Sequence, residues 1–125
     1  MYKIGNIDIE KYKCVTNDIL TSEVVITESQ ILHIRERHPN DYERYFKYAE
    51  EILKHPDYIL EANKPNTAFL LKHILDNDKR YQLILRLKTS NDPENYKNSV
   101  ITFLKVEEKR YNRYLRTKKI LYKSE

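Results

Sequence analysis

The sequence predicts an α+β fold in which N-terminal helices pack on one face of a four-stranded antiparallel β-sheet and a basic helix follows at the C-terminus. Two observations predict it. Apolar residues recur at helical spacing between positions 27 and 55, and four strand-like segments separated by turn residues lie between positions 58 and 106. Helices followed by a run of strands are typical of the α+β class. A chain of 125 residues can build one hydrophobic core, so we expect a single domain over residues 1–125.

The first 23 residues carry the weakest pattern. Isoleucines at positions 4, 7 and 9 alternate loosely around a Gly-Asn pair, which is typical of a short hairpin or an edge strand. We therefore expect residues 1–23 to form an N-terminal extension or hairpin of the domain.

A short helix is expected in the segment VVITESQILHIRERHP, residues 24–39. Thr27 is a favourable N-cap, and Gln30, three positions later, completes the capping-box pattern. The preceding Val-Val-Ile run is typical of a strand. Two isoleucines and a leucine give the helix an apolar stripe, and Pro39 ends it.

This helix carries two histidines and two arginines. His33 and Arg37 are four positions apart and Arg35 and His38 are three apart, so each pair shares a face. His33 and His38 are about 140° apart around an ideal helix, which disfavours a two-histidine metal clamp from this helix alone. A histidine beside an arginine suits phosphate chemistry, because imidazole transfers protons near neutral pH and guanidinium binds phosphate oxygens in a fork. Structural histidines and solvated arginines are the alternative interpretation.

A second amphipathic helix is expected in DYERYFKYAEEILKH, with Asp41 as its cap and Pro56 as its end. Turn-forming residues then separate four predicted strands. The strands are expected at residues 58–62, 67–75, 80–88 and 99–106.

Alternation along the third of these strands, RYQLILRLK, predicts which side chains share a face, because neighbouring side chains of a strand point to opposite sides. One face is wholly apolar and consists of Tyr81, Leu83, Leu85 and Leu87. The opposite face is basic and open, and consists of Arg80, Gln82, Ile84, Arg86 and Lys88. Depending on register, this open face also gains Lys72 or His73, and either Ser99, Ile101 and Phe103 or Val100, Thr102 and Leu104.

Composition excludes several classes of protein. The chain has one glycine and no tryptophan, so Gly-rich phosphate loops and dinucleotide-binding fingerprints are excluded. Its single cysteine precludes an intramolecular disulfide and a cysteine-rich zinc cluster. No apolar run is long enough to cross a bilayer, and the polar N-terminus lacks the hydrophobic centre of a signal peptide. We expect a soluble, cytoplasmic protein with no membrane partner.

Positive charge is concentrated near the C-terminus. The net charge is +4 and the pI is near 9.0, a modest excess that permits an anionic partner. In residues 105–123, basic residues outnumber acidic ones and alternate with Tyr111, Tyr114 and Tyr122. Such a segment can pair with phosphates while its rings stack on bases, or it can be a solvated helix whose tyrosines pack on the sheet.

Three stretches carry a resemblance to a known family: the helix VVITESQILHIRERHP, the segment EILKHPDYILEANKPNTAFLLKHI and the strand NSVITFLKV. Together they resemble the phage-associated members of the barnase, EndoU, colicin and RelE-like (BECR) nuclease superfamily. In that group a helix with an HI-x-x-RHP-type motif precedes an antiparallel four-stranded sheet. The resemblance covers about residues 24–123, and the helix motif and the closing strand are its most specific parts.

The resemblance implies a metal-independent endoribonuclease, toxin-like or encoded by a phage or mobile element, that needs no cofactor. It implies RNA as a partner, with tRNA and rRNA among the candidate targets, and an immunity or antitoxin protein as another. Sites in the superfamily combine a histidine from the helical part, a basic residue from the sheet and a hydroxyl from the last strand. Carried over onto this chain, the catalytic residues would be His33, Arg37, His38, Lys72 and Thr102.

Three further basic residues are expected to bind substrate. Arg86 and Lys88 follow from the open-face argument, and Arg35 follows from its place on the helix. Cleaving RNA without metal requires removal of the 2′-hydroxyl proton, stabilisation of the phosphorane and protonation of the 5′ oxygen. The chain has no second histidine late in the sheet, as barnase has, so the acid–base partner is left open.

Two other functions stay open. A catalytically inactive module of the same fold would keep the basic sheet and bind RNA or a protein partner. A phage-encoded structural or regulatory protein would use the histidines for capping and packing. Metal-dependent hydrolysis is disfavoured, because no three His, Asp or Glu residues show a recognisable ligand spacing.

Overall fold

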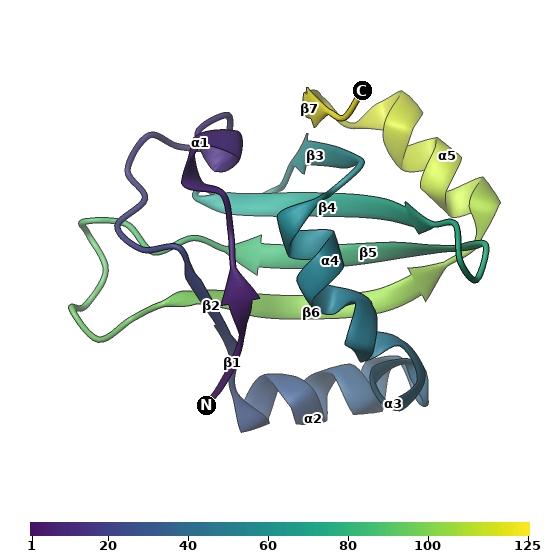
Figure 1. Ribbon diagram of the computed structural model, residues 1–125, viewed down its shortest axis with the longest axis horizontal. Helices are drawn as coiled ribbons and strands as arrows, with labels where there is room; N and C mark the ends of the chain where they lie inside the picture. Colours follow the sequence, from purple (N-terminus) through teal and green to yellow (C-terminus); the bar gives the residue numbers. More distant parts are fainter.

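The computed structural model describes residues 1–125 as one seven-stranded β-sheet with helices packed against it (Figure 1). The order of strands in the sheet is β1-β2-β6-β5-β4-β3-β7. None of the helices combines the length and the apolar character that a bilayer-crossing segment requires. In chain order the elements are β1 (Tyr2–Asn6), α1 (Ile9–Tyr12), β2 (Glu23–Ile26), α2 (Glu28–Arg37), α3 (Asp41–Tyr45), the 3-10 turn η1 (Phe46–Tyr48), α4 (Ala49–Lys54), β3 (Tyr58–Glu61), β4 (Thr67–Ile74), β5 (Lys79–Arg86), β6 (Asn98–Val106), α5 (Glu108–Thr117) and β7 (Ile120–Lys123).

The prediction of a four-stranded antiparallel sheet beneath N-terminal helices is wrong. The four expected strands are present as β3 to β6 and pair antiparallel with one another, but three more strands join them. β2 pairs in parallel with β6, β1 extends that edge, and β7 pairs with β3 at the opposite edge. A bare meander would leave unpaired N–H and C=O groups along both outer strands. Segments from the two ends of the chain satisfy those groups.

The added strands are too short for periodicity to indicate their partners. β2 and β7 have four residues each, and β2 pairs with Asn98 and Ser99, far along the chain. The expected C-terminal basic helix is present as α5, but it ends at Thr117 and the chain then returns to the sheet.

Helix α2 forms as the sequence predicts. Thr27 is its N-cap, and the capping box is complete: the Gln30 amide donates to Thr27 Oγ1 at 3.2 Å, and the Thr27 amide donates to Gln30 Oε1 at 3.1 Å. Ile31 and Ile34 are buried in the core. α2 follows directly after β2 and contacts β6 along the edge that β2 leaves unpaired (Figure 1).

The second expected helix is interrupted. The turn η1 separates α3 from α4, and Tyr45 leaves the helical region with φ −125° and ψ −9°. Tyr45 and Tyr48 both pack on Tyr81 of β5, with ring centroids 5.5 and 5.7 Å apart. Phe46 packs edge-on against Phe103 of β6 at 5.2 Å. The tighter winding lets three nearby rings reach the same face of the sheet, which explains the break.

Helices α2, α3 and α4 border the face of the sheet that carries the main hydrophobic core (Figure 1). The predicted apolar face of β5 is confirmed, because its four members are all fully buried there: Tyr81, Leu83, Leu85 and Leu87. A smaller cluster forms between the opposite face and α5, and it consists of Leu60, Phe69, Leu71, Leu104, Val106 and Tyr111. Helix α5 covers only part of this second face, which we call the open face.

Replacing Thr27 with Ala should lower the free energy of unfolding by about 1 kcal/mol, because the first turn of α2 loses a side-chain acceptor. Urea unfolding measures the change. Ser29 is exposed in the same turn and is not the capping residue, so Ser29→Ala should change the free energy by less than about 0.5 kcal/mol. Equal effects of the two substitutions would show that the cap does not stabilise α2.

Candidate functional site on the open face of the sheet

A hollow of about 580 Å³ opens on the open face beside the C-terminal end of α5. Side chains of β4, β5 and β6 form its floor, and the β3–β4 turn and the residue that follows α5 form its walls. An apolar floor with cations at its margin can accept a flat base and its phosphate. The lining residues are Ala62, Asn63, Lys64, Pro65, Thr67, Phe69, Ile84, Arg86, Ile101 and Lys118.

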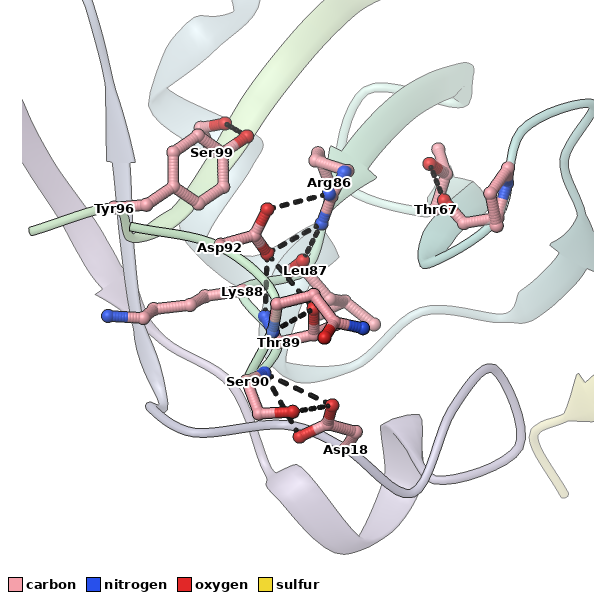
Figure 2. Close-up of polar contacts among 12 residues, drawn as sticks. Asp18, Thr67, Arg86, Leu87, Lys88, Thr89, Ser90, Asp92, Tyr96 and Ser99 are labelled. Carbon is pink, nitrogen blue, oxygen red and sulfur yellow. Dashed lines mark hydrogen bonds and ion pairs between the residues drawn. The ribbon is translucent and has the colours of Figure 1, made fainter. Parts of the chain in front are cut away.

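Arg86 is an anchored cation of this hollow (Figure 2). Its Nη2 and Nη1 atoms donate to the two carboxylate oxygens of Asp92 at 2.9 and 3.2 Å, and Nη1 also donates to the Leu87 carbonyl. The guanidinium lies over the ring of Tyr96, 5.6 Å from its centroid. Arg86 is thus fixed in orientation, and Asp92 balances part of its charge.

Asp92 ties the β5–β6 loop to the end of β5. It accepts a hydrogen bond from the Thr89 amide at 2.8 Å and another from the Thr89 hydroxyl at 3.2 Å. The Thr89 amide, and after it Arg86, holds the pKa of the Asp92 carboxyl below its ordinary value. Ser90 donates from its amide and its hydroxyl to Asp18, which precedes β2 (Figure 2). Two carboxylates from different segments therefore hold this loop beside the hollow.

Lys118 supplies a cation at the α5 side of the hollow. Its ammonium lies 4.6 Å from the centroid of the Phe69 ring, and that ring packs edge-on against Tyr114 of α5 at 4.8 Å. No carboxylate forms an ion pair with Lys118, whereas Arg86 is paired with Asp92. Lys118 therefore keeps its charge available to an anion.

A β-bulge brings two residues of β6 to this region. The register shifts between Ile84 and Leu85 of β5, so that Thr102 pairs with Ile84 while Val100 pairs with Leu85. Ile101 is the extra residue and is exposed at the margin of the hollow. Thr102 is half-buried and shares the open face with Ile84. Bulges are common beside active sites, because they redirect side chains.

The predicted helix residues lie at the edge of the sheet next to β6. His33 and Arg37 are exposed, whereas His38 is half-buried, so the two histidines are not equivalent. Burial lowers the pKa of the His38 imidazole below its ordinary value; Arg110 of α5, Arg37 and His33 act in the same direction, and Asp41 opposes them.

Lys72 and Thr102 lie on opposite faces of the sheet. Lys72 pairs in register with Tyr81, a member of the main core, and its ammonium forms an ion pair with Asp57 at 3.2 Å. His73, which pairs in register with Arg80, takes the open-face position. Because pairing fixes the face of each residue, the structure separates the two expected catalytic residues of the sheet.

Of the three expected substrate-binding residues, only Arg86 lines the hollow. Lys88 is buried, and its ammonium donates to the Glu94 carbonyl. Arg35 forms an ion pair with Glu43 at 2.6 Å on the exposed side of α2. Arg86 and Thr102 are thus the predicted site residues that the sheet brings onto one face.

Sequence reasoning missed Phe69, Lys118 and Asp92. Phe69 lies in TAFLLKHI, where buried apolar residues occupy both faces, so alternation gives no signal. Lys118 is one of several basic residues near the C-terminus, and only the end of α5 distinguishes it. Asp92 precedes Pro93 in a polar loop. An aspartate that opens such a turn is the signal that could have drawn attention to it.

Replacing Asp92 with Asn should destabilise the protein at neutral pH, because an amide cannot balance the charge of Arg86. The pKa of the Asp92 carboxyl is lower in the folded protein than its ordinary value near 3.8. Its contribution to the free energy of unfolding is therefore present above pH 3.8 and is lost as the pH falls through the folded pKa. The difference in free energy of unfolding between wild type and variant should therefore shrink below about pH 4.

Urea unfolding at a series of pH values measures this difference, with Asp76→Asn at an exposed position as the control. The control should differ little from wild type at any pH. A difference for Asp92→Asn that stays constant as the pH falls would contradict the anchoring role.

Comparison with known proteins agrees with the resemblance seen in residues 24–123. The sequence model of a family described as phage-Barnase-EndoU-ColicinE5/D-RelE like nuclease2 matches residues 2–123, nearly the whole chain. Searches among curated proteins and among solved structures found no match. The family match includes α2 and every strand of the sheet. The protein belongs to this phage-associated family of barnase-, EndoU-, colicin- and RelE-like nucleases.

Proposed function

We propose that the protein is a metal-independent endoribonuclease that binds RNA on its open face and cleaves it through the 2′-hydroxyl. Membership of a nuclease family supports cleavage of nucleic acid, and the phage association of that family supports a toxin-like, cytoplasmic role restrained by an immunity or antitoxin protein. The observation that carries the proposal is the hollow, where an anchored guanidinium and an unpaired ammonium flank an apolar floor. RNA supplies its own nucleophile, so cations, a hydroxyl and proton-transfer groups suffice for the reaction.

Arg86 and Lys118 are assigned to the phosphate. Their charges would stabilise the negative charge that develops on the phosphorane. Asp92 accepts hydrogen bonds only from the Nη atoms of Arg86, so the Nε–H of Arg86 can donate to a phosphate oxygen. Phe69 offers an aromatic surface to a base. Thr102, beside the hollow, is assigned to orienting a phosphate oxygen through its hydroxyl.

Proton transfer is assigned to the histidines of α2. The lowered pKa of His38 favours its neutral form near pH 7, as a general base requires. His33 is exposed on the same side of α2 as Arg37 and is assigned to protonating the departing oxygen. These roles require the cleaved bond to lie between the hollow and α2, within hydrogen-bond reach of both imidazoles.

A second candidate function is binding of RNA, or of a protein partner, without cleavage. Two features of the hollow favour it: Asp92 already balances part of the charge of Arg86, and none of the lining residues is a histidine. The same basic surface would then serve recognition alone.

Purified protein should cleave total tRNA or rRNA in the presence of EDTA and leave 2′,3′-cyclic phosphate ends, because the internal 2′-hydroxyl is the nucleophile. Gel electrophoresis and end-group analysis of the products measure this. An RNA with one 2′-deoxy nucleotide at the cut site is the matched control, and it should bind equally well and resist cleavage. Cleavage that EDTA abolishes and a divalent ion restores would overturn the mechanism. Binding without any cleavage would favour the second candidate function.

The cleavage rate should fall by about two orders of magnitude in His33→Ala, a loss typical of removing one proton-transfer group. His55→Ala is the control, since His55 is also exposed but follows α4.

Lys118→Ala should slow cleavage by about ten- to a hundredfold, at or below the loss typical of one transition-state donor. The neighbouring exposed Lys119 provides its control, Lys119→Ala. Equal rates within either pair would remove the tested residue from the mechanism.

A further inference from the structure

Helix α5 presents two fixed guanidinium groups beside the open face. Arg110 and Arg113 are exposed, and both lie against the ring of Tyr114, 5.5 and 5.8 Å from its centroid. Arg110 Nε also donates to the Tyr114 hydroxyl at 2.6 Å. The Tyr114 ring in turn packs on Phe69, which lines the hollow. We call Arg110, Arg113 and Lys118 the α5 edge.

The charges of the α5 edge are not balanced within the protein. The acidic residues nearest in sequence are engaged elsewhere: Glu107 pairs with Lys105 at 2.8 Å, and Glu108 lies 3.9 Å from Arg80. No carboxylate forms an ion pair with any of the three edge residues. A tyrosine ring holds the two guanidiniums instead, through cation–π contacts that orient a charge without cancelling it.

The α5 edge runs along the helix away from the hollow. Lys118 lines the hollow, and Arg113 and Arg110 lie farther toward the N-terminal end of α5. Eight positions separate Arg110 from Lys118, about 12 Å of rise along a helix. One nucleic-acid strand places a phosphate about every 3.4 Å when stacked, so about three phosphates fit along this edge.

We infer that the α5 edge is a phosphate-binding track that holds the RNA strand adjoining the cleaved bond. The inference rests on the proposed function of the open face. Arginine is suited to this task because its planar fork matches phosphate oxygens. The preferred substrate is therefore a polynucleotide several nucleotides long, and contacts remote from the cleaved bond supply much of its affinity.

The test compares two double variants that each remove two exposed positive charges outside any ion pair. Arg110→Ala with Arg113→Ala removes two members of the edge. Arg44→Ala with Lys47→Ala is the control, and its two charges lie on α3 and η1, which pack on the main core on the other face of the sheet. Because alanine favours helices, both variants should keep their secondary structure, and circular dichroism checks this.

Fluorescence anisotropy then measures binding of a 2′-O-methyl oligoribonucleotide, which cannot be cleaved through its 2′ position, over a range of salt concentrations. The edge variant should lower the slope of log K against log salt by about 1.4, which is about 0.7 for each of two lost phosphate contacts. The control variant should lower it by less than half as much. A dinucleotide, which is too short to follow the edge, should bind the edge variant and wild type alike.

Equal slopes for the two double variants would overturn the inference. Equally tight binding of poly-glutamate would also overturn it, because the edge would then recognise acidic polymers in general. The oligonucleotide readout does not depend on cleavage. If the edge variant and the control variant give the same salt dependence of binding, the result counts against the phosphate-binding track alone. Absence of RNA cleavage by the wild-type protein counts against the proposed function.

Discussion

Burial of alternate side chains along β5 fixes the register of the sheet, and the register decides which residues meet on the open face. The four apolar residues of β5 are fully buried on the side of the main core. At about 1.5–3 kcal/mol for each large apolar side chain, they contribute roughly 6–12 kcal/mol. A slip by one residue would expose all four. This loss is comparable with the whole net stability of a domain, about 5–15 kcal/mol. Arg86 is therefore held on the open face by residues that lie on the other side of its strand.

The two cations of the hollow are held in different ways. Asp92 and the ring of Tyr96 fix the orientation of the Arg86 guanidinium, and the Asp92 carboxylate balances part of its charge. Lys118 keeps its charge, and its ammonium rests on the Phe69 ring at the end of a flexible side chain. The two side chains are mostly shielded from solvent, with 27% and 14% of their surface exposed, so the Arg86–Asp92 ion pair contributes to stability as well as to geometry. It joins the β5–β6 loop to the floor of the hollow.

Local patterns in the sequence were sufficient for the central strands and for α2, because a strand with one buried face and a capping box both leave regular signals. Alternation in RYQLILRLK places Arg86 opposite the buried residues without any knowledge of its neighbours. The position of Lys72 could not be predicted in this way, since its strand is apolar on both faces and only pairing with Tyr81 assigns its side. The bulge at Ile101 changes the parity of β6, so neither alternating set expected for that strand faces one side throughout. Pairing of β1, β2 and β7 depends on contacts between distant segments, and periodicity carries no information about these.

The separation between the hollow and the two arginines of the α5 edge limits what each can contribute to a reaction. Contacts that hold a substrate equally in the ground state and the transition state lower KM without raising kcat. Phosphates along α5 lie away from the bond that breaks, so contacts with Arg110 and Arg113 should lower KM without raising kcat. Rate acceleration must come from groups whose interaction strengthens as charge develops on the phosphorane. Arg86 is already oriented and needs little reorganisation at that moment, while Lys118 can follow the phosphate as its geometry changes. In the proposed site, affinity depends mainly on α5, and catalysis depends on the few side chains that the register of β5 and the bulge of β6 bring together.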